Sequence, residues 1–511
     1  MSGSFSRRRF VKLMGAAAAA AASGRSASAD DRPLNVLFLM TDQQHFRCLG
    51  AAGNPLIHTP NLDRLAREGV NFTRATCVTP FCSPTRASLV TGLYPHGHGL
   101  NRNVHGGEHW LTDDKFPVTE NILHDAGWAT AHYGKWHLGR KDDLRCYEET
   151  GYAGPGYNEF LNKNCPKEQF ASDEGDARAW GRPVYMTPAV ERGHRRYQEW
   201  PRRSQQDIAI VGRTAVPREY LPETHMTNLA LDWIDEHKDR PWMLTCSWSP
   251  PHALWVCPEP YYSMYKRSLL PMPDNIDICP DMYKNQVGKK LGTFMGPEGI
   301  REYLGCYWGQ VSYIDWLVGR FLDRLDARGI ADNTLVIFTS DHGDMQGWHG
   351  AMGKSIGAFY DEILRVPLLM RLPGAIKPGT EVDSLVSSVD MMPTILDYVG
   401  QPCPDGIHGR SLRPHVEGRK RRDVAFCERA SHSGSWFQRM IRTERWKYAY
   451  RSRGQCELFD LKADPRENVN RLEDPKYRDR VMELHSRLRR WMESTDDPAV
   501  KLLESPLEKK A

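Results

Sequence analysis

The sequence lacks several features that would place it in other classes of protein. Its 12 cysteines include no CxxC pair, so the usual zinc and dithiol redox motifs are missing. No known nucleic-acid-binding module occurs and the formal net charge is only +4, so we expect no nucleic-acid partner. After residue 29 no stretch stays apolar for about 18 residues, which argues against a permanent membrane anchor. No internal repeat stands out, so nothing supports a repeat architecture.

The first 29 residues form a predicted export leader. A twin-arginine pattern at residues 6–12 precedes a short apolar run at 13–22, and residues 27–29 match an A-x-A cleavage site. We therefore expect the twin-arginine export machinery as a partner and a periplasmic or secreted location. Because this pathway moves folded proteins, the remaining cysteines either stay free or pair after export, for example Cys146 with Cys165.

The rest of the chain predicts a large α/β domain over residues 30–418. The nearly continuous apolar run at 34–40 indicates a strand buried on both faces of a parallel sheet. Strands that alternate with helices indicate a large, mainly parallel sheet flanked by helices. Further strands are expected at 129–133, 242–248, 334–339 and 367–371, and helices at 59–69, 82–92, 220–237, 308–328 and 392–400.

From residue 419 the pattern changes to short strands separated by turns. We predict a smaller C-terminal α+β subdomain with an antiparallel sheet over residues 419–511. Its strands are expected at 424–427, 437–441, 446–451 and 457–460, followed by a helix at 478–492. Between the predicted strands of the large domain, residues 141–218 are rich in glycine, proline, aromatics and arginine, and give no clear pattern of elements.

The most informative stretch is Cys82-Ser83-Pro84-Thr85-Arg86. It begins a predicted helix, and Pro84 is harmless in the first turn because its missing N–H would have no helical partner there. Free backbone N–H groups and the positive end of the helix dipole favour an anion at this end. Arg86 follows Cys82 by one turn, so both side chains can face one site. Taken alone, the stretch also fits a buried cysteine on a helix that proline begins.

Two aspartates end predicted strands. Asp42 follows the strand at 34–40, and Asp341 follows the strand at 334–339. In an open parallel sheet, ligands gather at the carboxyl ends of the strands, and carboxylates there suit a hard cation. The alternative for each is an aspartate that makes a turn.

Basic residues follow other predicted strands. Lys135 and His137 come after the strand at 129–133, and alternation would point both side chains inward. His252 follows the strand at 242–248, and Lys354 lies in a loop after Asp341. A single lysine or histidine is more often a structural or surface residue. The shared position of these four at strand ends is what indicates a common site.

These motifs together resemble the two signatures of the type I sulfatases, in the alkaline phosphatase superfamily. C-x-P-x-R at Cys82, followed by Leu89, Thr91-Gly92 and Tyr94-Pro95-His96, resembles the first signature. Residues 127–139 resemble the second, G-[YW]-x-T-x-x-x-G-K-x-x-L. The resemblance runs from about Asn35 to the C-terminus and includes residues 457–461 of the predicted C-terminal subdomain. It implies a sulfuric ester hydrolase that cleaves sulfate monoesters of a small molecule or saccharide.

The resemblance also implies cofactors. A formylglycine-generating maturase would oxidise Cys82 to Cα-formylglycine, whose hydrate is the nucleophile. A divalent metal would be held by Asp42, Gln43, residue 82, Asp341 and His342. Calcium is favoured because oxygen ligands dominate, and His342 leaves manganese open.

Roles for single residues follow from the same resemblance. Arg86 would hold the metal-side carboxylate and the formylglycine. His252 would protonate the leaving alcohol, and Asp341 would activate one hydroxyl of the hydrate. His137 would take the proton of the second hydroxyl as sulfate is expelled. The expected substrate-binding residues are Asn103, Lys135, His252 and Lys354.

Other hypotheses stay open. Gln43 and His342 replace the Asp and Asn of many sulfatases and also occur in phosphonate-hydrolase relatives, so a phosphonate monoester or phosphodiester hydrolase is an alternative. A non-catalytic saccharide-binding relative is a third hypothesis, although neither Cys82 nor the lysines are missing.

Two further groups of residues have two interpretations each. The arginine-rich residues 178–218 either bind a sulfated sugar or form a solvated insertion; their aromatics are Trp180, Tyr185, Tyr197 and Trp200. The second group is a set of histidines that forms either a hydrogen-bonding shell around the cysteine helix, which we favour, or a second metal site. These are His96, His98, His105 and His349.

Overall fold

The structure is a computed structural model of the chain. It describes residues 33–104, 108, 110–111, 115–139, 155–165, 171–172, 175–176, 183–201, 209–280, 283–354, 358–431 and 433–506. The predicted leader, His105, Cys146 and Trp180 lie outside these residues. Leu34–Ala511 form one compact unit, and Met1–Pro33 form another. None of the helices in the described ranges is long and apolar enough to cross a membrane.

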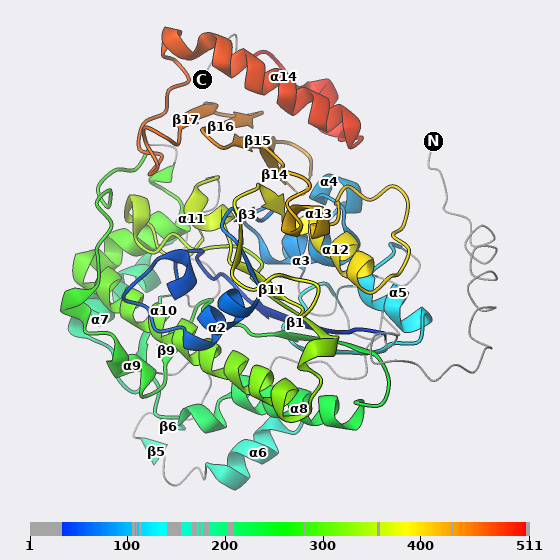
Figure 1. Ribbon diagram of the computed structural model, residues 1–511. Helices are drawn as coiled ribbons and strands as arrows, with labels where there is room; N and C mark the ends of the chain where they lie inside the picture. The colour runs from blue at the N-terminus through cyan, green and yellow to red at the C-terminus, as the bar shows by residue number, and fades with distance from the viewer. Residues whose placement is uncertain are drawn as a thin grey trace, which may run out of the picture. The chain divides into compact units, whose positions relative to one another are not determined.

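A seven-stranded, mainly parallel sheet lies at the centre of the larger unit (Figure 1). Its order is β12-β2-β11-β10-β1-β8-β4; β11 runs antiparallel to both of its neighbours and the other neighbouring pairs are parallel. The predicted fold class is confirmed. The strands are β1 (Asn35–Thr41), β2 (Val70–Phe72), β4 (Ala129–Gly134), β8 (Trp242–Ser247), β10 (Thr334–Ser340), β11 (Leu368–Arg371) and β12 (Thr380–Val382).

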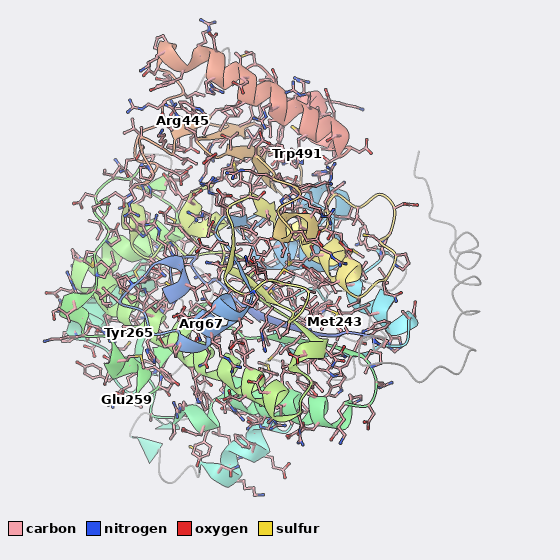
Figure 2. The ribbon with its side chains drawn as sticks, in the orientation of Figure 1. Arg67, Met243, Glu259, Tyr265, Arg445 and Trp491 are labelled. Atoms are coloured by element: carbon pink, nitrogen blue, oxygen red, sulfur yellow. The ribbon has the colours of Figure 1, made fainter. Side chains whose placement is uncertain are left out.

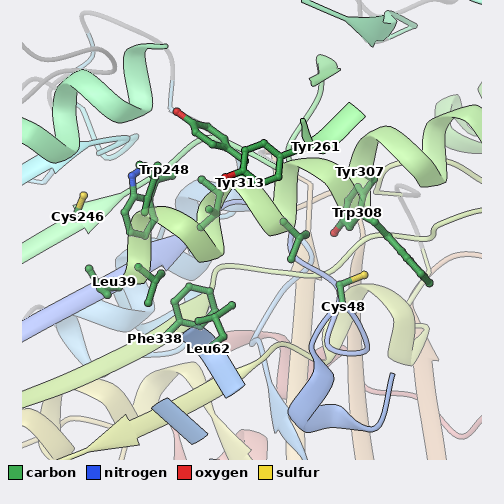
Figure 3. Packing of buried hydrophobic residues seen from close by; sticks show 14 of the residues in the cluster. Leu39, Cys48, Leu62, Cys246, Trp248, Tyr261, Tyr307, Trp308, Tyr313 and Phe338 are labelled. Atoms are coloured by element: carbon green, nitrogen blue, oxygen red, sulfur yellow. The ribbon is translucent and has the colours of Figure 1, made fainter. Parts of the chain in front are cut away.

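Side-chain alternation along β1 divides the core into two layers. Leu37 and Leu39 point into one layer, and Val36 and Phe38 into the other. Figure 3 shows Leu39 and Phe338 in the first layer. That layer also contains residues of α2 (Pro60–Glu68), α8 (Pro222–Glu236) and α10 (Val287–Ala327). The second contains residues of α3 (Cys82–Thr91), α5 (Thr119–Asp125) and α12 (Met391–Tyr398).

Helix α10 begins about 20 residues before the predicted helix at 308–328. It consists of two helical segments joined at Gly296, where φ is 64° and ψ is −179°. Pro297 follows, and proline cannot donate the backbone hydrogen bond that would continue the first segment. A Gly-Pro pair usually marks the end of a helix. Here the chain forms a second helical segment directly after it, so the sequence pattern did not predict one long helix.

The segment at 141–218 contains elements that the sequence did not predict. Thr187 accepts a hydrogen bond from Val190 N and caps α7 (Pro188–Glu199). Tyr197 is buried in the first core layer, so it takes no part in a sugar-binding surface, whereas Tyr185 is exposed. The other elements are α6 (Tyr157–Asn164), β5 (Ala171–Ser172), β6 (Gly175–Asp176) and β7 (Val211–Arg213), which pairs with β9 (Trp255–Cys257).

Several short elements connect these layers. The two-residue strands β3 and β13 pair in parallel beside the main sheet. The short elements are β3 (Ala75–Thr76), α4 (Pro95–His98), α9 (Tyr261–Met264), α11 (Asp361–Leu364), β13 (Val386–Ser387) and α13 (Arg413–Val416).

A four-stranded antiparallel sheet follows in the C-terminal part, as predicted. One face of this sheet is covered by α14 (Arg478–Ser494), on which Figure 2 labels Trp491. The Trp491 ring stacks on Phe426 with centroids 4.5 Å apart. The strands, in order across the sheet, are β14 (Val424–Ala430), β15 (Phe437–Thr443), β16 (Trp446–Arg451) and β17 (Glu457–Asp460).

A buried ion network joins this sheet to the α/β part. Lys447 of β16 lies 2.6 Å from Asp361 Oδ1 and 2.7 Å from Glu467 Oε1, and donates to Phe359 O at 2.8 Å. Arg442 also binds Asp361, at 2.9 Å. Because both lysine-bound carboxylates are buried, each needs its cationic partner to offset the loss of water.

We expect Lys447→Met to destabilise the protein by about 3–5 kcal/mol, because it leaves the buried Glu467 without its cationic partner, while Asp361 keeps Arg442. Guanidinium denaturation followed by tryptophan fluorescence measures the change. Lys462→Met is the matched control at an exposed position, and it should alter stability by less than about 0.5 kcal/mol. Equal stability of the two variants would show that the network does not hold the two parts together.

Candidate active site

The site begins with Cys82, the first residue of α3. Phe81 before it has extended backbone, and Gly92 ends the helix with a φ of 68°, as the sequence predicts. The Cys82 side chain is fully buried. Ser83 N donates to Asn103 Oδ1 at 3.2 Å, so Asn103 binds one of the free N–H groups of the first turn.

The two strand-end aspartates lie side by side under this helix. Strands β1 and β10 are neighbours, and Thr41 pairs with Ser340 in register. Asp42 and Asp341 therefore leave adjacent strands at the same edge, and both are fully buried. Gln43 N donates to Asp341 Oδ1 at 3.0 Å, which fixes that carboxylate.

Four residues form a cluster that could hold a metal ion. The potential ligand atoms of Asp42, Cys82, Asp341 and His342 all lie within 4.8 Å of one another. Cys82 Sγ is 3.3 Å from His342 Nε2 and 3.8 Å from Asp42 Oδ1. Two carboxylates and an imidazole are a suitable donor set for a divalent cation.

Gln43 is held by a residue that the sequence analysis did not select. Its Nε2 donates to Asp344 Oδ2 at 2.6 Å, and Tyr303 donates to Asp344 Oδ1. Because the amide nitrogen is bound, the oxygen is the atom that Gln43 could offer to a cation. The sequence signal for Asp344 is its position two residues after His342, in the short stretch that follows β10.

Arg86 joins the cluster to the sheet. Its Nε lies 2.9 Å from Asp341 Oδ2, and its Nη2 lies 3.5 Å from Asp42 Oδ2. Its Nη1 donates to Lys135 O at 2.6 Å and to Ser247 Oγ at 2.9 Å. Lys135 Nζ also binds Asp42 Oδ2.

Lys354 brings a second lysine to the cysteine. Its Nζ lies 2.9 Å from Cys82 Sγ, 3.3 Å from His342 Nε2 and 3.4 Å from His252 Nε2. His252 Nδ1 lies 2.7 Å from Ala253 O. A carbonyl accepts only, so Nδ1 carries the proton and a neutral ring presents Nε2 as an acceptor toward Lys354.

His137 lies differently from the sequence expectation. Strand β4 ends at Gly134, so the alternation argument does not reach His137, whose φ is 61°. Its carbonyl accepts a hydrogen bond from Ser83 Oγ at 2.6 Å. Within the described residues, the ring makes no hydrogen bond to the cluster. The structure thus brings together the side chains of the other predicted catalytic residues, while His137 contributes its backbone.

The electrostatics of the cluster favour anions. Burial raises the pKa of the Cys82 thiol, as does Asp42, but Lys135, Lys354 and His342 together bring it well below its usual value. Burial also opposes the ionised form of Asp42. The positive charges of Lys135, Lys354 and Arg86 nevertheless hold the pKa of Asp42 well below its usual range. An anionic group bound among these cations is stabilised by the same charges.

The other histidines form contacts outside the cluster. His98 Nε2 lies 3.0 Å from Ser88 Oγ on α3, as expected for a shell around this helix, whereas His349 contacts Asn275 and Ile278 O instead and is not part of such a shell. His96, Glu428 and Asp497 are close enough to hold a metal. However, Arg439 Nε already lies 2.5 Å from Asp497 and 3.6 Å from Glu428. This second group is therefore accounted for as an ion network between α4 and the C-terminal part.

A mainly parallel sheet with a buried, cation-rich cluster at its carboxyl edge defines a hydrolase of anionic esters. The family model "Sulfatase" matches residues 34–401. A second model, "N-sulphoglucosamine sulphohydrolase, C-terminal", matches residues 347–494. The chain belongs to the sulfatase family, in the alkaline phosphatase superfamily, and is a sulfuric ester hydrolase.

Similar proteins include both sulfatases and a phosphonate hydrolase. An arylsulfatase of Clostridium perfringens is 29% identical over 481 residues, covering 91% of this chain and 95% of its own. An N-acetylglucosamine-6-O-sulfatase of Bacteroides thetaiotaomicron is 28% identical over 498 residues, covering 88% and 84%. The crystal structure of a phosphonate monoester hydrolase of Agrobacterium radiobacter matches with a TM-score of 0.74 and 26% identity, covering 89% and 95%.

We expect Arg86→Lys to lower kcat for 4-nitrophenyl sulfate by about 100-fold or more, because a lysine cannot keep the bonds to both Asp341 and Ser247. Initial rates at saturating substrate measure this. Arg67→Lys is the matched control, since Arg67 is exposed on α2, and it should keep full activity. An active Arg86→Lys enzyme would show that the guanidinium geometry is unimportant.

Proposed function

We propose that this protein hydrolyses sulfate monoesters of saccharides through a hydrated Cα-formylglycine made from Cys82, with a divalent metal, preferably calcium, beside it. The observation that carries the proposal is the position of Cys82 Sγ. It is fully buried, 2.9 Å from Lys354 Nζ and 3.3 Å from His342 Nε2, among the strand-end carboxylates. The sulfur stands in for the oxygens of the hydrated aldehyde.

The residues for the metal are Asp42, Gln43, Asp341, His342 and residue 82. Their donors are mostly carboxylate and amide oxygens, which favours calcium; the imidazole keeps manganese as the alternative. When bound, the metal would supply positive charge to the sulfuryl oxygens and to the nucleophile. The hydrated aldehyde would supply the attacking oxygen and a second hydroxyl whose deprotonation expels sulfate.

The chain's own cations bind and orient the sulfate group. Lys135 and Lys354 are candidates to neutralise the sulfuryl oxygens, and Arg86 holds Asp341 in place. Burial gives these charges more effect than they would have in water, because little solvent competes for the anion. Asn103, which binds the first turn of α3, is a further candidate for substrate contact.

Proton transfers are assigned to three residues. Asp341 accepts the proton of the attacking hydroxyl. Burial, helped by Lys354 and Lys135, lowers the pKa of His252 to about 4, so its ring is neutral at pH 7 in the free site. A bound sulfate anion raises that pKa, so His252 can then carry the proton for the leaving alcohol. His137 is the candidate to accept the proton of the second hydroxyl, since its Nδ1 has no hydrogen-bond partner among the described residues.

The burial of Cys82 also bears on when it is modified. A fully buried thiol is out of reach of a second enzyme, so we propose that the maturase acts before folding. With a twin-arginine leader at 1–29, this places the modification before export to the periplasm. We further propose 30–418 as the catalytic domain and 419–511 as the C-terminal subdomain.

A phosphonate monoester or phosphodiester hydrolase is the second candidate function. It is favoured by the 26% identity to the Agrobacterium radiobacter enzyme, together with Gln43 and His342 at the candidate metal site. Hydrolysis of 4-nitrophenyl sulfate and of bis(4-nitrophenyl) phosphate by the same preparation separates the two. The proposal expects the higher kcat/KM for the sulfate, and a preference for the diester would overturn it.

We expect Cys82→Ala to lower sulfatase kcat by about three orders of magnitude or more, because it removes the nucleophile. Peptide mass analysis of wild-type protein made with a maturase should show formylglycine at residue 82. Cys403→Ala is the control, since Cys403 is exposed and distant in sequence. Full activity of the Cys82→Ala protein with an unchanged fold would contradict the assignment of the nucleophile.

We expect Asp42→Asn to lower the bound metal from about one ion per chain to almost none at micromolar free metal, since a charged oxygen ligand is lost. Elemental analysis after gel filtration measures this, and circular dichroism checks the fold. Asp405→Asn, at an exposed position, should keep the metal. Full metal content in both Asp42→Asn and Asp341→Asn would show that the metal lies elsewhere.

A further inference from the structure

A pocket adjoins the cluster on the side of His252. Its space, counted together with the open solvent at its mouth, is about 600 Å³, and residues of α8, α10, β9 and the loop after β8 line it. His252, which lies 3.4 Å from Lys354, belongs to its wall. The pocket therefore meets the cluster where the alcohol half of an ester must leave. Most of the wall is apolar or aromatic, with Leu254, Val256 and Tyr313 among its members.

The wall contains a buried carboxyl group that pairs with no cation among the described residues. Glu223 is the second residue of α8 and is 6% exposed. Within the described part of the chain, no basic side chain forms an ion pair with it. Burial raises its pKa to about 7, opposed by a hydrogen bond from its own backbone N–H. An unpaired buried carboxyl is costly, and carboxyls with a pKa shifted in this way cluster at functional sites.

A second acceptor lies in the same wall. Gln310 of α10 donates from Nε2 to Leu254 O at 3.0 Å and to Val256 O at 3.1 Å. These two carbonyls fix which end of the amide carries the nitrogen. Its Oε1 is buried and has no hydrogen-bond partner in the described structure. The residue is only 4% exposed, so solvent does not easily satisfy this oxygen.

On the basis of the proposed function, we propose that this pocket receives the alcohol half of the ester and that Glu223 and Gln310 select it. Gln310 Oε1 accepts hydrogen bonds, and so does Glu223 in its ionised form, which a bound cation stabilises; the pocket therefore favours an alcohol that carries an amine or hydroxyl donors. An N-sulfate or carboxylate facing Glu223 would meet a like charge and an acceptor that it cannot satisfy. The substrate class is therefore a sulfated sugar with a free amine or hydroxyl, without a second anion on that side.

Inhibition by the desulfated alcohol tests the pocket without knowledge of the sulfate position. D-Glucosamine and its N-sulfo derivative are compared as inhibitors of 4-nitrophenyl sulfate hydrolysis at pH 7. We expect glucosamine to bind about 10-fold or more tightly than the N-sulfo sugar, because a charge-assisted hydrogen bond is gained and a like-charge contact avoided. Glu223→Gln should remove most of this difference, because its neutral amide keeps the size of the side chain and loses the charge.

Glu219→Gln is the matched control, since Glu219 is an exposed carboxyl just before α8; it should keep the wild-type preference. Equal inhibition by both sugars in the wild type, or an unchanged preference in Glu223→Gln, would overturn the inference. If the enzyme hydrolyses bis(4-nitrophenyl) phosphate but not the aryl sulfate, the proposed function fails. The inhibition is then measured with the diester, and the same two outcomes still decide the role of the pocket.

Discussion

The arrangement of this site depends on one buried guanidinium, that of Arg86. It contacts Asp42 after β1, Asp341 after β10, the carbonyl of Lys135 after β4, and Ser247 at the end of β8. Four strands of the sheet thus meet at one side chain, which α3 supplies from the residue one turn after Cys82. The position of the cysteine relative to the carboxylates is fixed through this contact.

Such an arrangement is costly to build and useful once built. Charges removed from water are destabilising unless each has a partner, and here each carboxylate faces a guanidinium or an ammonium group. The same cations that make the buried aspartates tolerable exceed them in number, so the cluster retains affinity for an anion. Stability and anion binding therefore rest on the same charges, and the apolar pocket beside His252 adds the surface that an alcohol needs.

Much of this could be predicted from the sequence, since the informative residues lie close together in the chain. The apolar run before Asp42 and the Cys82–Arg86 stretch each specify a local structure, and adjacent parallel strands place their ends together. The full length of α10 was not predicted, because Gly296 and Pro297 indicate a break in the helix and not the junction of two helical segments. The position of the His137 side chain was not predicted, because the alternation of side-chain directions along β4 ends with the strand at Gly134.

The pocket was beyond sequence reasoning for a different reason. Glu223 and Gln310 lie far apart in the chain, and each fits an ordinary amphipathic helix. Only the packing of α8 against α10 shows that, among the described residues, Gln310 Oε1 has no hydrogen-bond partner and Glu223 forms no ion pair. Asp344 is intermediate, because it is close in sequence to the site, yet its contact with Gln43 requires the folded loop.

The central claim is that sulfate ester hydrolysis occurs at residue 82, between the strand-end carboxylates and Lys354. A crystal structure of the modified enzyme with metal and sulfate tests it most directly. The account predicts metal density bound by Asp42 and Asp341, formylglycine at residue 82, and sulfate in contact with Lys135 and Lys354. A metal or sulfate bound at another place, with this cluster occupied only by water, would contradict it.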